Sequence, residues 1–468
     1  MLSKYLWAPA FALVVALALF SVGNPAWAGP PADAFGLFES IPVPKTPSNN
    51  TAGGLYSFDI SWVDQATHRY YLADRSNNTV DIVDTTSNTL IFRLGTGTFA
   101  GFTGANSTSG PNGVATSGHC LFVTDSPSRV ASYDTTPALP MFVNAVFTDT
   151  SIPRDPTRAD ELAVDPLHSL ILAINNTPTP PLNAPYGTFI SFNPATCGLT
   201  QPASPGVDRV VFNAATGFGA ATNGAEQPLW DPGTGKFYLS IPQISGVGPN
   251  GAVFRIDPIS KSVDSSYPVR FCSPAGLTKG PNDDVLVGCN TIWDTTGGLW
   301  TGNADRNTNT AAPIQVILNV RTRDQFRVGG VGVGDEVWFN SEDGNYYTAS
   351  SGSPLVPNAI TPARPPLGTA LAAPTLTAQG AAILGVIDAN HGQLLQLVPT
   401  FNVPAVVAPD TDVHPAGTAH SVAADGQFGL VYVPLAANNV YPDCTTGCIA
   451  VYKRGASEQP IEVVFPPP

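Results

Sequence analysis

The sequence predicts an all-β fold, a seven-bladed β-propeller of four-stranded antiparallel blades. A sequence pattern typical of two short strands joined by a turn recurs seven times along the chain. Groups of such strands return about every 40–60 residues, which is typical of propeller blades. The composition is rich in Gly and Pro, and only 12% of the residues are charged, which disfavours a helical bundle or a disordered chain. Six or eight blades remain open, because the fifth and sixth units are weakly marked.

The first 28 residues have the pattern of a signal peptide. Lys4 precedes an apolar run at 11–20, and small residues at 26–28 resemble a cleavage site. The run is short for a membrane span, and no later segment is longer and equally apolar. We therefore expect a chain that starts at Gly29 and is secreted or periplasmic, with an uncleaved anchor as the alternative.

Residues 29–53 are predicted to form an extended lead-in, which could add an edge strand that closes the ring. A single propeller domain is expected over 54–468. Propellers escape the usual size limit of roughly 250–300 residues for one core, because each blade packs only on its neighbours.

The first unit is complete, and the later units repeat it with less regularity. Its four expected strands are 58–63, 70–73, 79–83 and 89–94. The inner strands of the later units are expected at 113–115, 162–164, 228–230, 276–278, 337–340 and 422–424, and the last strand of the seventh unit at 461–465. A Pro- and Ala-rich insertion at 352–380 shows no strand period. Such a loop is either a lid or a solvated segment.

Six cysteines follow the leader, an even number that suggests three disulfides in an oxidising compartment. Cys444 and Cys448 would close a tight loop, and Cys272 with Cys289 would join two strands of one blade. Cys120 with Cys197 follows by elimination. The absence of a Cys-x-x-Cys motif disfavours a zinc site.

The net charge of −14 disfavours nucleic acid or an anionic membrane as a partner. The glycine-rich run at 329–334 lacks the βαβ context of a dinucleotide site. Three recurring tryptophans are interpreted as core between blades: Trp62, Trp230 and Trp338.

One position in each unit, five residues before the turn, carries most of the chemistry. Six of these seven positions are polar, and four are carboxylates: Asp59, Asn112, Asp160, Glu226, Ala275, Asp335 and His420. If the blades close into a ring, these side chains converge on its axis. The alternative is that they bind channel water or neighbouring backbone groups.

Parts of this chain resemble two repeat families. Residues 68–84 resemble the YVTN-type repeat, and 110–115 with 121–125 resemble NHL-type repeats. The segment from Glu226 to Asp231 (Glu-Gln-Pro-Leu-Trp-Asp) is similar to a segment of the gluconolactonase/senescence-marker family. That family holds a divalent ion on the propeller axis, which implies that Asn112, Asp160 and Glu226 are ligands.

The functional hypothesis from these residues is a central divalent-metal site. Oxygen ligands favour Ca²⁺ over zinc, and the expected ligands are Asp59, Asn112, Asp160, Glu226 and Asp335. His420 would be the general base, because its ordinary pKa lies near neutrality. The activity would be lactonase-like hydrolysis or lyase chemistry on a small, oxygen-rich molecule.

The alternative is a non-catalytic exported propeller that binds protein or glycan. Arg158 could bind a substrate carboxylate or be a surface charge. The sequence does not identify a protein partner.

Overall fold

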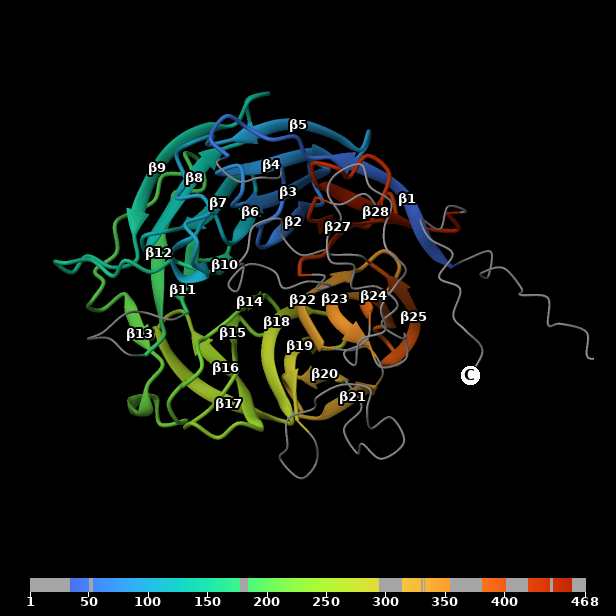
Figure 1. Ribbon diagram of the computed structural model, residues 1–468. Coiled ribbons are helices and arrows are strands. Elements are labelled where there is room, and N and C mark those ends of the chain that lie inside the picture. The colour runs from blue at the N-terminus through green and yellow to red at the C-terminus, as the bar shows by residue number, and fades with distance from the viewer. Residues whose placement is uncertain are drawn as a thin grey trace, which may run out of the picture.

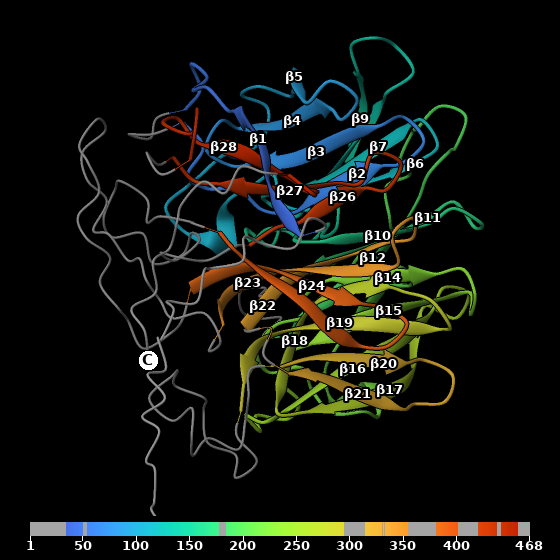
Figure 2. The same cartoon turned by 90° about the vertical axis from the view of Figure 1, so that its right-hand side faces the viewer.

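The computed structural model describes residues 34–49, 54–176, 184–293, 314–329, 331, 333–353, 381–400, 420–437 and 441–456. In this part of the chain the strands form seven four-stranded antiparallel sheets. Figure 1 shows the sheets arranged as blades around one axis, and Figure 2 shows the ring from the side. The predicted seven-bladed propeller is confirmed.

Each of the first six blades begins with its innermost strand and proceeds outward along the chain. The first two blades consist of β2 (Ser61–Asp64), β3 (Arg69–Asp74), β4 (Thr79–Asp84) and β5 (Thr89–Leu94), then β6 (Val114–Ser117), β7 (Cys120–Asp125), β8 (Arg129–Asp134) and β9 (Met141–Phe147). The third and fourth consist of β10 (Leu162–Asp165), β11 (Leu170–Asn175), β12 (Tyr186–Ser191) and β13 (Arg209–Val211), then β14 (Pro228–Asp231), β15 (Lys236–Ile241), β16 (Asn250–Asp257) and β17 (Ser262–Arg270).

The last three blades follow the same plan with longer inner strands in two of them. They consist of β18 (Cys272–Lys279), β19 (Asp284–Ile292), β20 (Ile314–Asn319) and β21 (Gln325–Gly329), then β22 (Val333–Asn340), β23 (Asn345–Ser353), β24 (Ala381–Asp388) and β25 (Gln393–Pro399), then β26 (Ala423–Asp425), β27 (Leu430–Leu435), β28 (Cys448–Arg454) and β1 (Phe35–Pro42). Two short 3-10 turns lie in loops, η1 (Asn106–Thr108) and η2 (Ala214–Thr216). No helical segment in the described part of the chain has the length and apolarity that a membrane crossing needs.

The first and the last described strands of the chain meet in the seventh blade. Strand β1, which lies in the predicted lead-in, pairs with β28 from Phe35 opposite Arg454 to Pro42 opposite Cys448. In Figure 1 the blue β1 accordingly lies beside the red β28. The fourth strand of this blade is therefore β1, whereas the sequence placed it at 461–465, outside the described residues. Residues 1–28 also lie outside them.

The core consists of seven apolar clusters, one between each pair of neighbouring blades. Between the first two blades, for example, Tyr71 and Ala73 pack with Leu121 and Val123. The second strands of the third and seventh blades, β11 and β27, are buried along their whole length and are apolar almost throughout. The clusters lock the blades side by side, and this packing fixes what their inner strands present to the axis.

All three predicted disulfides are confirmed. Cys272–Cys289 joins β18 to β19, and Cys444–Cys448 closes a short loop before β28. Cys120 on β7 bonds to Cys197 in the loop after β12, so this bridge ties the second blade to the third. Three disulfides and no free cysteine among the described residues are typical of a protein that folds in an oxidising compartment. Export itself stays a prediction.

Candidate functional site

The inner strands of the blades run in the same direction around the axis, so residues that precede them gather at one end. Four of the predicted positions stand two residues before an inner strand: Asp59, Asn112, Asp160 and Glu226. His420 precedes β26, and Asp335 lies within β22. Hydrogen bonds and ion pairs connect all six, directly or through one intervening side chain. We call these six residues the axial ring.

Arg75 is the first connector of the axial ring. It follows β3, yet its side chain is only 2% exposed. It forms an ion pair with Asp59 and donates hydrogen bonds of 3.0 and 2.8 Å to Oδ1 of Asn112 and of 2.7 Å to Oδ1 of Asn106. A single guanidinium therefore joins the first blade to the segments that lead into the second.

Arg158 and Asn176 extend the network to the third and fourth blades. Nη2 of Arg158 lies 2.8 Å from Oδ2 of Asp160, and its Nη1 lies 3.7 Å from Oδ2 of Asp59. The Nδ2 group of Asn176 lies 3.0 Å from Oδ2 of Asp160 and 2.9 Å from Oε2 of Glu226. Arg158 is thus a buried partner of the ring carboxylates rather than a surface charge.

His420 closes the network between the first and sixth blades. Its Nε2 lies 2.9 Å from Oδ1 of Asp59, and its Nδ1 lies 3.1 Å from Oδ2 of Asp335. Burial alone would lower the pKa of His420, but the charges of Asp335 and Asp59 raise it to about 10. At neutral pH the imidazole of His420 is therefore protonated, so it can donate a proton but cannot accept one. The general-base role stays a prediction, and this environment disfavours it.

The carboxyl groups of the axial ring have opposite pKa shifts. Burial would raise the pKa of Asp59, but Arg75, His420 and Arg158 together hold it well below its ordinary value. Burial and the charge of Asp160 raise the pKa of Glu226 to about 8. Asp59 is therefore a permanent anion, whereas Glu226 binds a proton at neutral pH.

Two further carboxyl groups extend from the axial ring into the centre of the propeller. Glu161 and Glu336, which follow ring residues in sequence, line a cavity of about 490 Å³ that runs along the inner strands of all seven blades. Both are more than nine-tenths buried. Within the described structure, Oε2 of Glu161 has no hydrogen-bond partner. Burial, together with the charge of Glu336, holds the pKa of Glu161 well above its ordinary value.

The walls of this channel are partly aromatic. Trp62, Trp230 and Trp338 pack against the clusters between blades, as predicted, but they are only partly buried and also line the cavity. The rings of Trp62 and Trp338 meet edge to face with centroids 5.2 Å apart. The interpretation of these residues as core alone is therefore corrected: they form the wall of a channel.

The axial region holds more acids than bases. Its buried or half-buried carboxyl groups outnumber its three cationic groups, Arg75, Arg158 and His420, by three: Asp59, Asp160, Glu161, Glu226, Asp335 and Glu336. Neighbouring carboxylates repel each other unless protons or a cation compensate. The raised pKa values of Glu161, Glu226 and Glu336 show that protons compensate in this arrangement.

Comparison with solved structures finds other propellers. Hydrazine synthase of Kuenenia stuttgartiensis superposes with a TM-score of 0.54 at 10% identity, over 87% of this chain and 96% of that chain. The WD40 domain of Neurospora crassa Pan2 gives a TM-score of 0.50 at 8% identity, over 92% and 97% of the two chains. At these identities the likeness shows the fold alone.

No family model and no curated protein matches the sequence. The resemblances to YVTN and NHL repeats and to gluconolactonases stay predictions at the level of the family, while the coarser assignment to the propeller fold stands.

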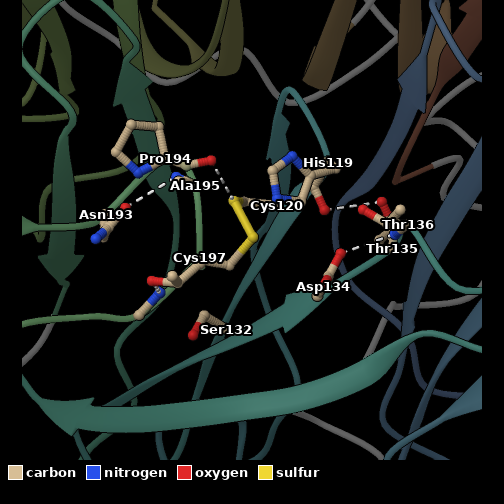
Figure 3. The surroundings of a disulfide bond; sticks show 12 residues. His119, Cys120, Ser132, Asp134, Thr135, Thr136, Asn193, Pro194, Ala195 and Cys197 are labelled. Carbon is tan, nitrogen blue, oxygen red and sulfur yellow. Dashed lines mark hydrogen bonds between the residues drawn. A yellow bond between two sulfur atoms is a disulfide. The ribbon is translucent and has the colours of Figure 1, made fainter.

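The described residues contain one group of three side chains whose potential ligand atoms lie within reach of one metal ion. It consists of His119, Cys120 and Cys197, away from the axial ring. Figure 3 shows that the two sulfur atoms of this group form the disulfide. Because the thiolate is the metal-binding form of cysteine, this group is not a metal site.

The stability of the fold is expected to decrease as the pH rises from 6 to 9. The pKa of Glu226 is about 8 in the folded state and 4.5 ordinarily. Its contribution to the stability of the fold is therefore lost as the pH rises from 4.5 to about 8. The pKa of His420 is raised from 6.5 to about 10, so its contribution is complete below 6.5 and is also lost as pH rises. Both groups act in the same direction, and we expect Tm to fall by roughly 5 °C.

Calorimetry in EDTA across this range measures the effect without a metal contribution. Glu226→Gln should flatten the dependence of Tm on pH between pH 5 and 8, because it removes a carboxyl group that titrates in this range. A Tm that rises between pH 6 and 9 would contradict the assignment of protonated acids to the axis.

Proposed function

We propose that this chain is a binding propeller that holds a small molecule in its central channel. The observation that carries the proposal is the position of Glu161, a buried acid that lines the cavity and whose Oε2 has no hydrogen-bond partner. Leaving such a group unsatisfied costs about 1–3 kcal/mol. A ligand with a complementary polar group would offset this cost.

The size and lining of the channel support the proposal. Its volume of about 490 Å³ lies within the range of roughly 300–1,000 Å³ that is typical of small-molecule sites. Such sites combine apolar and aromatic walls with a few placed polar groups. Here Trp62, Trp230 and Trp338 supply the walls, and Glu161 and Glu336 supply the polar groups.

The axial ring supports the proposal through rigidity. Arg75 and Arg158 hold the segments that precede Glu161 and its neighbours by several hydrogen bonds each, so the carboxyl groups keep their positions before a ligand arrives. Preorganised polar groups bind more tightly, because less freedom is lost on binding.

A fragment screen by crystal soaking tests this proposal. The set contains small amines, carboxylates and neutral polyols. We expect fragment density in the channel of the parent protein and none in Val164→Trp, which fills the cavity from a partly exposed wall position. The matched control is Ile259→Trp, which adds a tryptophan at a 72% exposed turn and should bind as the parent does. An empty parent channel, or binding that survives Val164→Trp, would refute the proposal.

Metal-assisted hydrolysis is the second candidate, favoured by the surplus of three carboxyl groups. The ligands would be Asp59, Asn112, Asp160, Glu226 and Asp335, and a bound Ca²⁺ would polarise a carbonyl group or activate water. Each of these residues already pairs with an arginine, asparagine or histidine. A cation would have to displace those partners and lie beside two guanidinium groups, so we rank this candidate second.

Melting with and without calcium separates the two candidates. We expect less than about 1 °C between EDTA and 1 mM Ca²⁺, because Arg75, Arg158 and His420 already balance the ionised acids. A metal ion present at a concentration of one hundred times its Kd would raise the free energy of unfolding by about 2.7 kcal/mol. A calcium-dependent rise that disappears in Glu226→Gln and Asp335→Asn, with lactone or ester cleavage lost in the same variants, would favour the hydrolase.

A further inference from the structure

We infer that the channel ligand is a small organic cation, an alkylammonium compound whose charged head lies between the tryptophan walls and the carboxyl groups of Glu161 and Glu336. This inference rests on the proposed function, since it assumes that the channel is the binding site. It adds the chemical class of the ligand.

The aromatic wall is the first argument. Trp62, Trp230 and Trp338 come from the first, fourth and sixth blades and surround one cavity. Tryptophan is the best aromatic partner for a cation, which is attracted within about 6 Å of the ring centroid. Nε1 of Trp62 donates to Oγ1 of Thr116 at 2.9 Å, so this indole N–H is engaged with the protein. Several aromatic faces around a carboxylate are the arrangement that recognises quaternary ammonium groups.

The charge of the channel is the second argument. Among the described lining residues, Lys279 is the single basic one, and its Nζ lies 4.0 Å from Asp283. Arg75 and Arg158, which connect the residues of the axial ring, already form ion pairs with Asp59 and Asp160. Lys279 aside, an anionic ligand would meet acids and no cation among the described lining residues, whereas a cationic ligand would take the place of the protons that compensate these acids.

The hydrogen bonds of the wall argue against a neutral polyol. Three polar wall side chains are already paired within the protein: Ser61 with Ser421, Gln227 with the backbone N–H of Leu277, and Thr278 with that of Phe339. A sugar needs many hydrogen bonds to replace its water. The carboxyl groups of Glu161 and Glu336 remain as the main polar groups of the channel, and they suit one compact charged head.

Calorimetric titration with choline and with 3,3-dimethylbutan-1-ol tests the inference. The two probes have nearly the same shape, but only choline is charged. We expect choline to bind at least tenfold more tightly, which corresponds to about 1.4 kcal/mol. Equal affinities, or an absence of choline binding, would overturn the inference.

Three substitutions locate the binding. Glu161→Gln keeps the size of the side chain and removes the carboxylate that forms when the cation replaces its proton, and Trp338→Leu removes one aromatic wall; each should weaken choline at least tenfold. The matched control is Glu39→Gln on the exposed side of β1, which should leave the affinity unchanged. If Glu161→Gln does not fold, Glu336→Gln provides the same comparison. Full affinity in both glutamine variants would overturn the inference.

The outcomes distinguish this inference from the proposed function. Choline that fails to bind while neutral or anionic fragments occupy the channel would end the cation assignment and leave the binding propeller intact. A channel that admits none of the fragments would end both.

Discussion

Replacing Arg75 by methionine is expected to destabilise the folded protein by about 3–5 kcal/mol, the usual cost of removing one partner of a buried ion pair. The side chain is 2% exposed and bonds to Asp59, Asn112 and Asn106. Methionine has a similar length but leaves Oδ1 of Asn112 without its donor, and it takes the guanidinium away from Asp59, which keeps His420 as its close cationic partner. Urea unfolding, read by intrinsic fluorescence, measures the loss.

The matched control for this prediction is Arg321→Met. Arg321 also pairs with an aspartate, Asp283, at 2.7 Å, but its side chain is 56% exposed. Exposed pairs contribute about 0–1 kcal/mol, so this variant should resemble the parent. Adding Asp59→Asn to Arg75→Met should recover part of the loss, since it removes the stranded charge. Equal small losses in Arg75→Met and Arg321→Met would show that the axial ring does not join the blades.

The second large effect is expected from the Cys120–Cys197 disulfide. Its removal by a double alanine substitution should cost about 4.5 kcal/mol, because the bridge closes a loop of 77 residues in the unfolded chain. The same change at Cys444–Cys448, with a sequence separation of 4, should cost about 2 kcal/mol. All four cysteines are fully buried, so the cavities are matched and the difference reports loop length.

Reversible unfolding of the two double variants under identical conditions gives the comparison. A loss at the short loop equal to or larger than that at the long loop would contradict the expectation. It would mean that local packing rather than chain entropy decides what each disulfide contributes.

The sequence predicted the fold because each blade is a local unit with its own strand period and turns. The axial positions followed from the same repeat: once the ring closes, residues that precede inner strands share one end of it. Ala275 is the apolar exception among the seven positions, and in the structure it is buried within β18, near an irregularity in its pairing with β19.

The connectors could not be predicted in the same way. Arg75 follows β3 in a turn, and turn residues are usually solvated. Its burial also depends on Asn106, which belongs to a loop that the local pattern does not position. Without these arginines, the sequence predicts a cation or protons as the compensation for the carboxylates, and it does not show that two of these acids pair with His420.

The channel acids were missed for a different reason. In a regular strand, neighbours point to opposite faces, so a polar residue next to a ring position is expected to point away from the axis. Glu161 precedes the first residue of β10, and Glu336 lies within an irregularity in the pairing of β22 with β23, between Gly334 and Val337. Strict alternation does not apply at such points, and both acids line the cavity.

The most direct measurement of the central claim is a crystal structure with (2-bromoethyl)trimethylammonium, whose bromine is located by its anomalous scattering. We predict a bromine peak inside the channel, with the ammonium head between Trp338 and the carboxyl groups of Glu161 and Glu336, and no such peak in crystals of Val164→Trp. Bromine found only on the outer surface of the blades, or equally in both crystals, would contradict the account.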